Sequence, residues 1–307
     1  MEKIALFVPA RFPATGTQLQ TYDVVGPEAL AADAPILKQV RGIAAAGSMP
    51  IGADLFVRMP KLEIVAKFGV GYDTVDVDAA RAANVVVTNT PDVLTDEVAD
   101  LAIGLLISTV RRIPQADRFV REGKWPSGGF PLSGSLRGRR VGILGLGRIG
   151  RAIADRLVAM RLEVAYCTRT PQTGLSYAYY DSPLALAQSC DVMIVVVPGG
   201  AATDGLVSQD VIEALGPDGV LINIARGSVV DETALIKALE SGRLGASGLD
   251  VFVDEPNVPA ALMALPNVVL LPHIGSATGA TRDAMGDLVL ANLESWFAGR
   301  GPLTPVS

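Results

Sequence analysis

Short apolar runs alternate with helix-like segments along almost the whole chain. In the first third, apolar runs with the length and composition of strands lie at residues 3–9, 41–47, 62–68 and 84–90. Residues 74–84 show helical spacing, and residues 95–113 predict one long, mostly buried helix. Continuous apolar strands with helices between them indicate a parallel sheet that is covered on both faces.

The same alternation continues after a segment rich in Gly, Pro and Ser at residues 122–138, the clearest change of composition in the chain. Strand candidates follow at 139–145, 162–167, 191–198, 219–225, 244–251 and 267–272, and a helix is predicted over 281–299. We therefore expect an α/β fold of two doubly wound parallel-sheet domains, Rossmann- or flavodoxin-like, with a cleft between them.

Length and composition agree with two globular domains. The 307 residues exceed what one hydrophobic core usually holds. The chain has 26 Lys and Arg against 32 Asp and Glu, a net charge of -6 that argues against non-specific nucleic-acid binding. Cys167 and Cys190 are too few for a disulfide framework, and no run is long enough for a membrane span or a signal peptide. We expect a soluble cytoplasmic protein with no metal, membrane or nucleic-acid partner.

The strongest local motif is a glycine turn between a strand candidate and a helix candidate. Gly145, Gly147 and Gly150 have G-x-G-x-x-G spacing, with Arg148 and Ile149 between the last two glycines. The first glycine permits a tight turn, the second lets a pyrophosphate approach the backbone, and the third lets helix and strand pack closely. A structural turn could use the same glycines, but the strand–turn–helix context favours dinucleotide binding.

The next strand candidate ends in Thr168, Arg169 and Thr170, where a protein that prefers NAD carries an acid. An acid would repel a 2′-phosphate, whereas an arginine flanked by hydroxyls can bind one. Arg169 could also be an ordinary solvated residue at a strand end. The pattern favours NADP(H), with NADPH preferred and NADH possible.

Three polar groups follow successive strand candidates in the second half. They are Arg226, Glu255 and His273, the only histidine in the chain. The carboxyl ends of parallel strands face the ligand crevice, so these groups should collect beside the nicotinamide. The alternative is a buried core histidine with two surface charges. Asp250 could either lie near the nicotinamide or cap a turn.

These motifs together resemble the D-isomer-specific 2-hydroxyacid dehydrogenase family. The stretches "LGLGRIG", "NIARGSVVDETAL", "GLDVFVDEP" and "LPHIGSAT" occur in that family's order, and "FGVGYDTVD" extends the resemblance over essentially the whole chain. Within the family, "VVVPGGAAT" and the "TRT" strand end look most like NADPH-dependent glyoxylate/hydroxypyruvate reductases. The resemblance implies a substrate-binding domain at 1–100, completed by the helix at 281–307, and a dinucleotide-binding Rossmann domain at 101–280.

By this resemblance Arg226, Glu255 and His273 are the catalytic residues. A permanently charged guanidinium can hold the carboxylate of a 2-oxo acid and polarise its carbonyl. Hydride transfer leaves negative charge on the carbonyl oxygen, and an imidazole oriented by a carboxylate can supply the proton. Further contacts to the cofactor are expected at Pro198, Ala225, Asp250 and Gly275.

The substrate side is less specific. The family's counterpart of "KFGVGYDTVD" binds the substrate carboxylate through backbone N–H groups, which implies Val70 and Gly71 as donors here, although a tight turn without a ligand is the alternative. Ser48 and Ser276 are weaker candidates for the same pocket. Trp125 and Phe130 lie in the 122–138 connector, which in related reductases packs across a two-fold dimer, so the resemblance implies a homodimer. Local core packing of these two aromatic side chains is the alternative.

The leading hypothesis is an NADPH-dependent reductase of small 2-oxo acids, glyoxylate and hydroxypyruvate first. One alternative keeps the chemistry on a larger 2-oxo acid, such as hydroxyphenylpyruvate or 2-ketogluconate. Another is a non-catalytic NAD(P)-sensing binding protein of the same fold.

Overall fold

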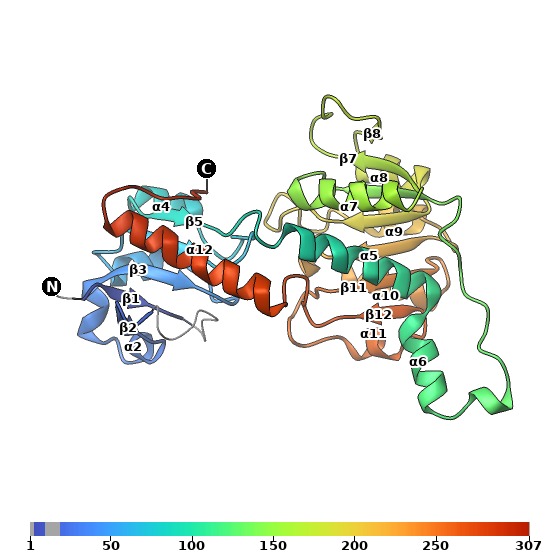
Figure 1. The fold of residues 1–307 in the computed structure, drawn as a ribbon, viewed down its shortest axis with the longest axis horizontal. Helices are drawn as coiled ribbons and strands as arrows, with labels where there is room; N and C mark the ends of the chain where they lie inside the picture. The colour runs from blue at the N-terminus through green and yellow to red at the C-terminus, as the bar shows by residue number, and fades with distance from the viewer. Residues whose placement is uncertain (1–2, 10–18, 307) are drawn as a thin grey trace. The chain divides into compact units, whose positions relative to one another are not determined.

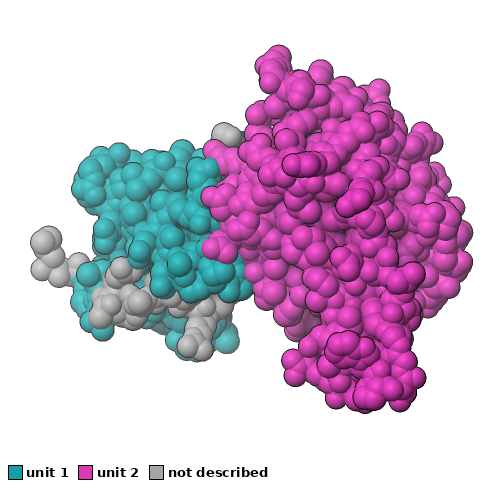
Figure 2. Space-filling view, turned by 45° about the vertical axis from the view of Figure 1, so that its right-hand side comes forward, with its two compact units in different colours: residues 1–94, 276–307 teal, residues 95–275 magenta. Residues whose placement is uncertain are grey.

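The computed structural model describes residues 3–9 and 19–306. The chain forms two compact units, one made of residues 1–94 and 276–307 and the other of residues 95–275 (Figure 2). The helix predicted over 281–299 is α12 (Gly279–Phe297) and lies in the first unit. No helix within the described ranges is long and apolar enough to cross a bilayer.

The first unit contains, in its described part, a five-stranded parallel sheet in the order β2-β1-β3-β4-β5. Its strands are β1 (Ala5–Phe7), β2 (Asp23–Val25), β3 (Val40–Ala45), β4 (Ile64–Lys67) and β5 (Val86–Thr88). This order is the flavodoxin-like one, in which the chain reverses its winding direction beside the first strand. The strand β2 was not predicted, since two of its three residues are exposed and it carries little apolar signal.

Helices cover both faces of this sheet. They are α2 (Glu28–Ala31), η1 (Pro35–Gln39), α3 (Ala53–Arg58), α4 (Val77–Ala82) and α12. Leu293 and Phe297 of α12 lie against Gly42 of β3, whereas Ile43 next to it joins the core formed with α3 and α4. Figure 1 shows α12 running across the strands. Successive strand residues therefore point into two different apolar layers, which is why these strands read as continuous apolar runs.

The second unit, all of which is described, contains a seven-stranded parallel sheet in the order β12-β11-β10-β9-β6-β7-β8. Its strands are β6 (Arg140–Leu144), β7 (Glu163–Cys167), β8 (Ala178–Tyr180), β9 (Val192–Val195), β10 (Val220–Asn223), β11 (Ala246–Leu249) and β12 (Val268–Leu270). The winding direction reverses beside β6, the strand that precedes the glycine turn. A doubly wound sheet binds its ligand at this reversal.

The helices of this unit are α5 (Thr95–Arg111), α6 (Ile113–Arg121), η2 (Trp125–Ser127), α7 (Arg148–Ala159), α8 (Pro183–Ser189), α9 (Gln209–Ala214), η3 (Gly227–Val229), α10 (Glu232–Glu240) and α11 (Ala260–Ala264). Helices lie on both faces of the sheet, whereas α6 projects away from it and has no buried residue (Figure 1). The helix predicted over 95–113 ends at Arg111, because Arg112 has a left-handed backbone (φ 54°) and α6 starts after it. Cys167 and Cys190 are both buried free thiols.

Candidate active site

The glycine turn joins β6 to α7 in the second unit. Gly145 has φ 99°, a conformation that side chains rarely adopt. A Cβ at Gly150 would stand 2.2 Å from the carbonyl oxygen of Gly145, so helix and turn approach as closely as glycine permits. A Cβ at Gly147, the residue that precedes α7, would meet no heavy atom within 4 Å. The backbone at the helix N-terminus is thus open on the side that a pyrophosphate needs, and the residues fit a bound dinucleotide.

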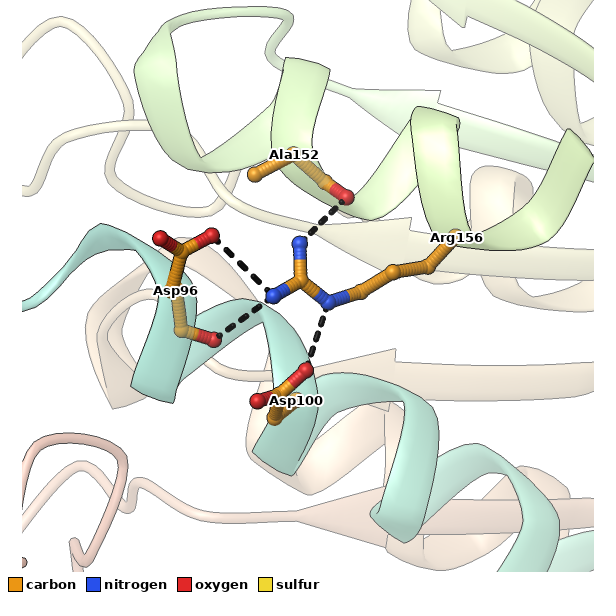
Figure 3. Close-up of polar contacts among 4 residues, drawn as sticks. All are labelled: Asp96, Asp100, Ala152 and Arg156. Carbon is orange, nitrogen blue, oxygen red and sulfur yellow. Dashed lines mark hydrogen bonds and ion pairs between the residues drawn. The ribbon is translucent and has the colours of Figure 1, made fainter. Parts of the chain in front are cut away.

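The helix behind this turn is fixed to α5 by Arg156 (Figure 3). The Arg156 guanidinium donates to the carboxylates of Asp100 at 2.6 Å and Asp96 at 3.1 Å, and to the carbonyl of Ala152 at 3.0 Å. The hydrogen bond to Asp100, followed by the one to Asp96, raises the pKa of Arg156 above its ordinary value against the opposing effect of burial. Because both carboxylates are largely exposed, these ion pairs contribute little to the stability of the fold.

The predicted 2′-phosphate site lies after β7. The Thr168 hydroxyl donates to the carbonyl of Thr170 at 2.7 Å, which curls the loop, while Arg169 extends into solvent. Gln172 ties this loop to the glycine turn, since its amide donates to the carbonyl of Leu146 at 2.9 Å. Arg151 of α7 donates in turn to the Gln172 side-chain oxygen at 2.5 Å. Two arginines therefore border the loop.

Glu255 and His273 form a hydrogen-bonded pair after β11 and β12. His273 Nδ1 lies 2.7 Å from Glu255 Oε2, and the other carboxylate oxygen accepts the N–H of Phe252 at 3.0 Å. The side chains are 47% and 34% exposed respectively, so the pair can reach a ligand. The backbone of His273 is left-handed, with φ 53°, and its N–H donates to the carbonyl of Asp250 at 2.9 Å. Such strained residues are often found at functional sites.

Glu255 is held as a carboxylate. Partial burial alone would raise its pKa, but the hydrogen bonds from His273 and Phe252 and the charges of His273 and Arg226 together lower the pKa below the ordinary value. An ionised carboxylate only accepts hydrogen bonds, so Nδ1 of His273 must carry the proton in this contact. The other ring nitrogen, Nε2, is then the one left to exchange a proton with a ligand.

Arg226 stands where β10 leads into η3. It is half-buried, its Nη1 donates to the carbonyl of Ala225 at 2.8 Å, and its charge acts on Glu255. The buried Asn223 shapes this corner, because its side chain accepts the N–H of Ala225 at 3.0 Å and donates to the carbonyl of Arg226 at 2.9 Å. A Cβ at Gly227 would stand 2.0 Å from the backbone of Phe252, so this loop runs directly against the segment that carries Glu255.

Asp250 caps the turn after His273. Its carboxylate, 2% exposed, accepts the N–H of Ile274 at 2.8 Å and that of Gly275 at 2.9 Å. Burial raises the pKa of Asp250, and the two backbone hydrogen bonds and the His273 charge only partly oppose it. The structure shows that Asp250 caps the turn, and its role beside the nicotinamide stays a prediction. The capping thereby fixes the left-handed turn that presents His273.

The substrate candidates of the first unit follow β3 and β4. Ser48 is exposed, and the neighbouring Gly47 carbonyl accepts a 2.7 Å hydrogen bond from the buried Lys67. Val70 and Gly71 are half-buried in the turn after β4. Ser276 also belongs to this unit and is half-buried.

The remaining cofactor candidates lie in the second unit at or after strand ends. Ile149 is half-buried and Arg148 exposed at the start of α7. Pro198 follows β9 and is exposed, and its carbonyl accepts the Thr203 hydroxyl at 2.7 Å. Ala225 follows β10 and is buried.

Residues 103–275 match the NAD binding domain of the D-isomer specific 2-hydroxyacid dehydrogenases. The match covers more than half of the chain. The chain belongs to this family.

Curated members of the family are similar over most of their length. Hydroxyphenylpyruvate reductase of Plectranthus scutellarioides is 50% identical over 277 residues, 90% of this chain and 88% of the relative. Glyoxylate/hydroxypyruvate reductase A of Arabidopsis thaliana is 50% identical over 88% of this chain and 85% of its own. Among solved structures, the NADPH-dependent glyoxylate/hydroxypyruvate reductase from Sinorhizobium meliloti, in complex with NADP and malonate, is 50% identical. It superposes with a TM-score of 0.95 over 100% of this chain and 97% of its own.

Several residues that shape this dehydrogenase site carry no recognisable motif. Asn223 reads as the polar end of an apolar strand, and Gln172 as an ordinary loop residue. Gln172 contacts Leu146 and Arg151, which only the folded chain brings near. Asn223 contacts the backbone of Ala225 and Arg226 in a local turn that its residue type permits but does not require. The one available signal is a carboxamide directly after three buried apolar residues, since a buried polar side chain requires hydrogen-bond partners.

Proposed function

We propose that this dehydrogenase reduces small 2-oxo acids, glyoxylate and hydroxypyruvate first, to D-2-hydroxy acids with NADPH. The observation that carries the proposal is the 2.7 Å contact between His273 and Glu255, in the same unit as the open glycine turn. A proton donor and a dinucleotide site in one domain are what reduction of a carbonyl requires. The activities named for the relatives from Arabidopsis thaliana and Sinorhizobium meliloti support the substrate class.

NADP(H) is the proposed cofactor. Arg169 is exposed after β7, Arg151 borders the same loop, and Thr168 and Thr170 provide hydroxyls around it. Positive charge with no acid at this strand end suits a 2′-phosphate. The Sinorhizobium meliloti relative binds NADP, which supports the assignment, and NADH is expected to be a weaker alternative. Bound in the nicotinamide site, the cofactor supplies the hydride.

Substrate binding is assigned to charged and backbone donors. Arg226 would hold the carboxylate and polarise the carbonyl with a charge that persists at any physiological pH. Within the first unit, the N–H groups of Val70 and Gly71 would donate to a substrate carboxylate, and Ser48 and Ser276 would add hydroxyl contacts. Asp250 and Gly275 support the turn that carries His273.

Proton transfer is assigned to His273. With Nδ1 bound to Glu255, Nε2 donates a proton to the oxygen that becomes negative as the carbonyl carbon is reduced. The Glu255 carboxylate fixes the ring orientation and stabilises its positive charge before transfer. In the reverse direction the neutral imidazole accepts the hydroxyl proton.

A larger 2-oxo acid is the second candidate substrate. The chain is as similar to a hydroxyphenylpyruvate reductase as to a glyoxylate/hydroxypyruvate reductase, at 50% identity for both, and 44% identical to a 2-ketogluconate reductase of Gluconobacter oxydans. The chemistry assigned to Arg226, Glu255 and His273 is the same for each.

The experiment that tests the proposal is a steady-state assay of the purified protein with glyoxylate, hydroxypyruvate, hydroxyphenylpyruvate and 2-ketogluconate, each with NADPH and NADH. The proposal predicts the highest kcat/KM for the two small acids with NADPH. A higher kcat/KM for hydroxyphenylpyruvate or 2-ketogluconate would identify a larger 2-oxo acid as the substrate and leave the proposed catalytic roles unchanged. Binding of NADPH without turnover of any 2-oxo acid would contradict the proposal and favour a sensor protein.

A homodimer and a cytoplasmic location complete the proposal. Large apolar side chains are exposed along α6 and the connector after it, with Val120 53%, Trp125 66% and Leu132 99% exposed. Side chains of this kind gain free energy when a second copy covers them. Sedimentation equilibrium of the wild type and of a Trp125→Glu, Leu132→Glu double variant tests whether the protein is a dimer.

The proposed cytoplasmic location is supported by the two unpaired, buried cysteines, which suit a reducing compartment.

A further inference from the structure

We infer that Asn89 and Thr90 are positioning residues that fix the two backbone N–H groups of the carboxylate-binding turn 69–71. The inference rests on the proposed function, because it concerns the donors that the proposal assigns to the substrate. Both residues follow β5, the strand next to β4, from which the turn emerges. All the contacts involved lie within the first unit.

Thr90 forms hydrogen bonds with both the N–H and the carbonyl of Gly69. The Gly69 N–H donates to the Thr90 hydroxyl at 3.0 Å, and the Thr90 N–H donates to the Gly69 carbonyl at 3.0 Å. Thr90 is fully buried, and the left-handed φ of Gly69, 130°, allows the chain to turn here. The peptide unit between Gly69 and Val70 is planar and trans, so its C=O and N–H point in opposite directions. With the carbonyl bound to Thr90, the Val70 N–H must point away from Thr90.

Asn89 fixes the next peptide unit in the same way. Its side-chain amide donates to the Val70 carbonyl at 2.9 Å. The Gly71 N–H belongs to that peptide plane and therefore points away from Asn89. Among the residues that the structure describes, neither the Val70 nor the Gly71 N–H donates a hydrogen bond. Two successive donors are thus aligned and unused, the arrangement that a carboxylate requires.

The C-terminal segment holds Asn89 in place. The Asn89 N–H donates to the Thr304 carbonyl at 3.3 Å, and the Thr304 hydroxyl donates to the Asn89 carbonyl at 2.6 Å. The fully buried Asn292 of α12 accepts the N–H groups of Leu303 and Thr304, each at 3.0 Å. The residues after α12 therefore connect that helix to the carboxylate-binding turn through Asn89.

Because Asn89 and Thr90 already fix the turn 69–71, the substrate does not lose binding free energy in orienting its N–H groups. Without the Asn89 amide, the Val70–Gly71 peptide can rotate and turn a carbonyl lone pair, instead of an N–H, toward the carboxylate. Donors that are already aligned bind an anion more tightly than donors that must first reorient. The effect belongs to binding of the carboxylate, so it should appear in KM more than in kcat.

The test is the Asn89→Asp variant, which keeps the shape of the side chain but can no longer donate to the Val70 carbonyl when ionised. Oxamate, a 2-oxo acid analogue that accepts no hydride, is titrated into the NADPH complex of the variant and the wild type. We expect the Kd of oxamate and the KM of the 2-oxo acid to rise about tenfold, with kcat and the Kd of NADPH unchanged.

Asn267→Asp is the matched control. The Asn267 amide also donates to backbone carbonyls, those of Gly245 at 3.1 Å and Leu239 at 3.5 Å, but it lies before β12 in the second unit. It should leave oxamate binding at the wild-type value. If the wild type and Asn89→Asp have the same oxamate affinity and the same KM, the inference about Asn89 is wrong, but the proposed function stands. A wild type that neither binds oxamate nor reduces any 2-oxo acid would overturn the proposed function, and the inference with it.

A second measurement needs no variant. In ¹H–¹⁵N spectra of the wild-type NADPH complex, oxamate should shift the amide resonances of Val70 and Gly71 strongly and slow their exchange with solvent. The Gly69 amide, already bonded to Thr90, should respond much less. An unchanged Val70 and Gly71 pair on saturation with oxamate would contradict the inference even if Asn89→Asp does not fold.

Discussion

The Nδ1 atom of His273 and the Oε2 atom of Glu255 lie 2.7 Å apart, joining the segments that follow β12 and β11. This contact selects one tautomer of the only histidine in the chain, because Glu255 is ionised and can only accept. It also places a negative charge beside a ring that must be positive before it can give up a proton.

Glu255→Gln should slow the reduction of 2-oxo acids. The amide is neutral, so it neither fixes the proton on Nδ1 of His273 nor places a negative charge beside the ring that must give up a proton. We expect kcat to fall about tenfold, with the Kd of NADPH unchanged. The measurement is steady-state kinetics of the wild type and the variant, and an unchanged kcat would show that Glu255 does not assist proton transfer by His273.

Arg169→Asp should change the choice of cofactor. The substitution removes a cation and adds an acid at the strand end, so kcat/KM for NADPH should fall at least about tenfold more than kcat/KM for NADH. Arg161→Asp is the control, since it makes the same charge change at the other end of β7, at an exposed residue. Equal losses with the two cofactors in the Arg169 variant would exclude this residue from the phosphate site.

Asn223→Leu should weaken both the fold and the site. The change leaves the buried N–H of Ala225 and the carbonyl of Arg226 without their partner, at a cost of about 2 kcal/mol in the free energy of unfolding. The KM for the 2-oxo acid should also rise, because the corner that positions Arg226 loosens. Ser247→Ala removes another buried hydrogen bond in the same sheet, to the Leu221 carbonyl, and should lower stability without raising KM. Urea unfolding and steady-state kinetics separate the two effects.

The buried thiols should resist alkylation and limit stability at high pH. Burial raises the pKa of Cys167 to about 11 and that of Cys190 to about 12. Because the folded pKa is above the unfolded value of about 8.5, the thiols stabilise the fold at neutral pH, and this contribution is lost as the pH rises from about 9 toward 11. Iodoacetamide at pH 8 should modify neither thiol in the native protein and both in urea. Rapid labelling of the native protein would contradict the burial.

The apolar pattern was sufficient to predict the α/β class, because most strands of both sheets are buried on two faces and read as continuous apolar runs. It could not locate β2 or β8, which are short edge strands with exposed residues. The break after Arg111 was also missed. Arg112 is unremarkable in sequence, and an arginine gives no signal for the left-handed backbone that it adopts between α5 and α6.

Some residues of the candidate site could likewise be predicted from the sequence, and others could not. The turn of Gly145, Gly147 and Gly150 could be predicted from the glycine spacing between a strand and a helix candidate, and the structure shows the steric need for glycine at Gly145 and Gly150.

The roles of Asn223 and Asn89 could not be predicted. Asn89 contacts the Val70 carbonyl, 19 residues away, which only folding brings within reach. Asn223 contacts the backbone of Ala225 and Arg226 in a local turn that an Asn permits but does not require. A carboxamide at the end of an apolar strand does not reveal which carbonyl it will contact.

The central claim is that His273 supplies the proton when a 2-oxo acid is reduced. Its most direct test is the rate of NADPH oxidation with hydroxypyruvate by the wild type and by His273→Gln, with the Kd of NADPH measured for both. The account predicts rapid oxidation by the wild type, a fall in kcat of about 100-fold or more in the variant, and the same Kd of NADPH. Near-normal turnover by a folded His273→Gln protein would contradict it.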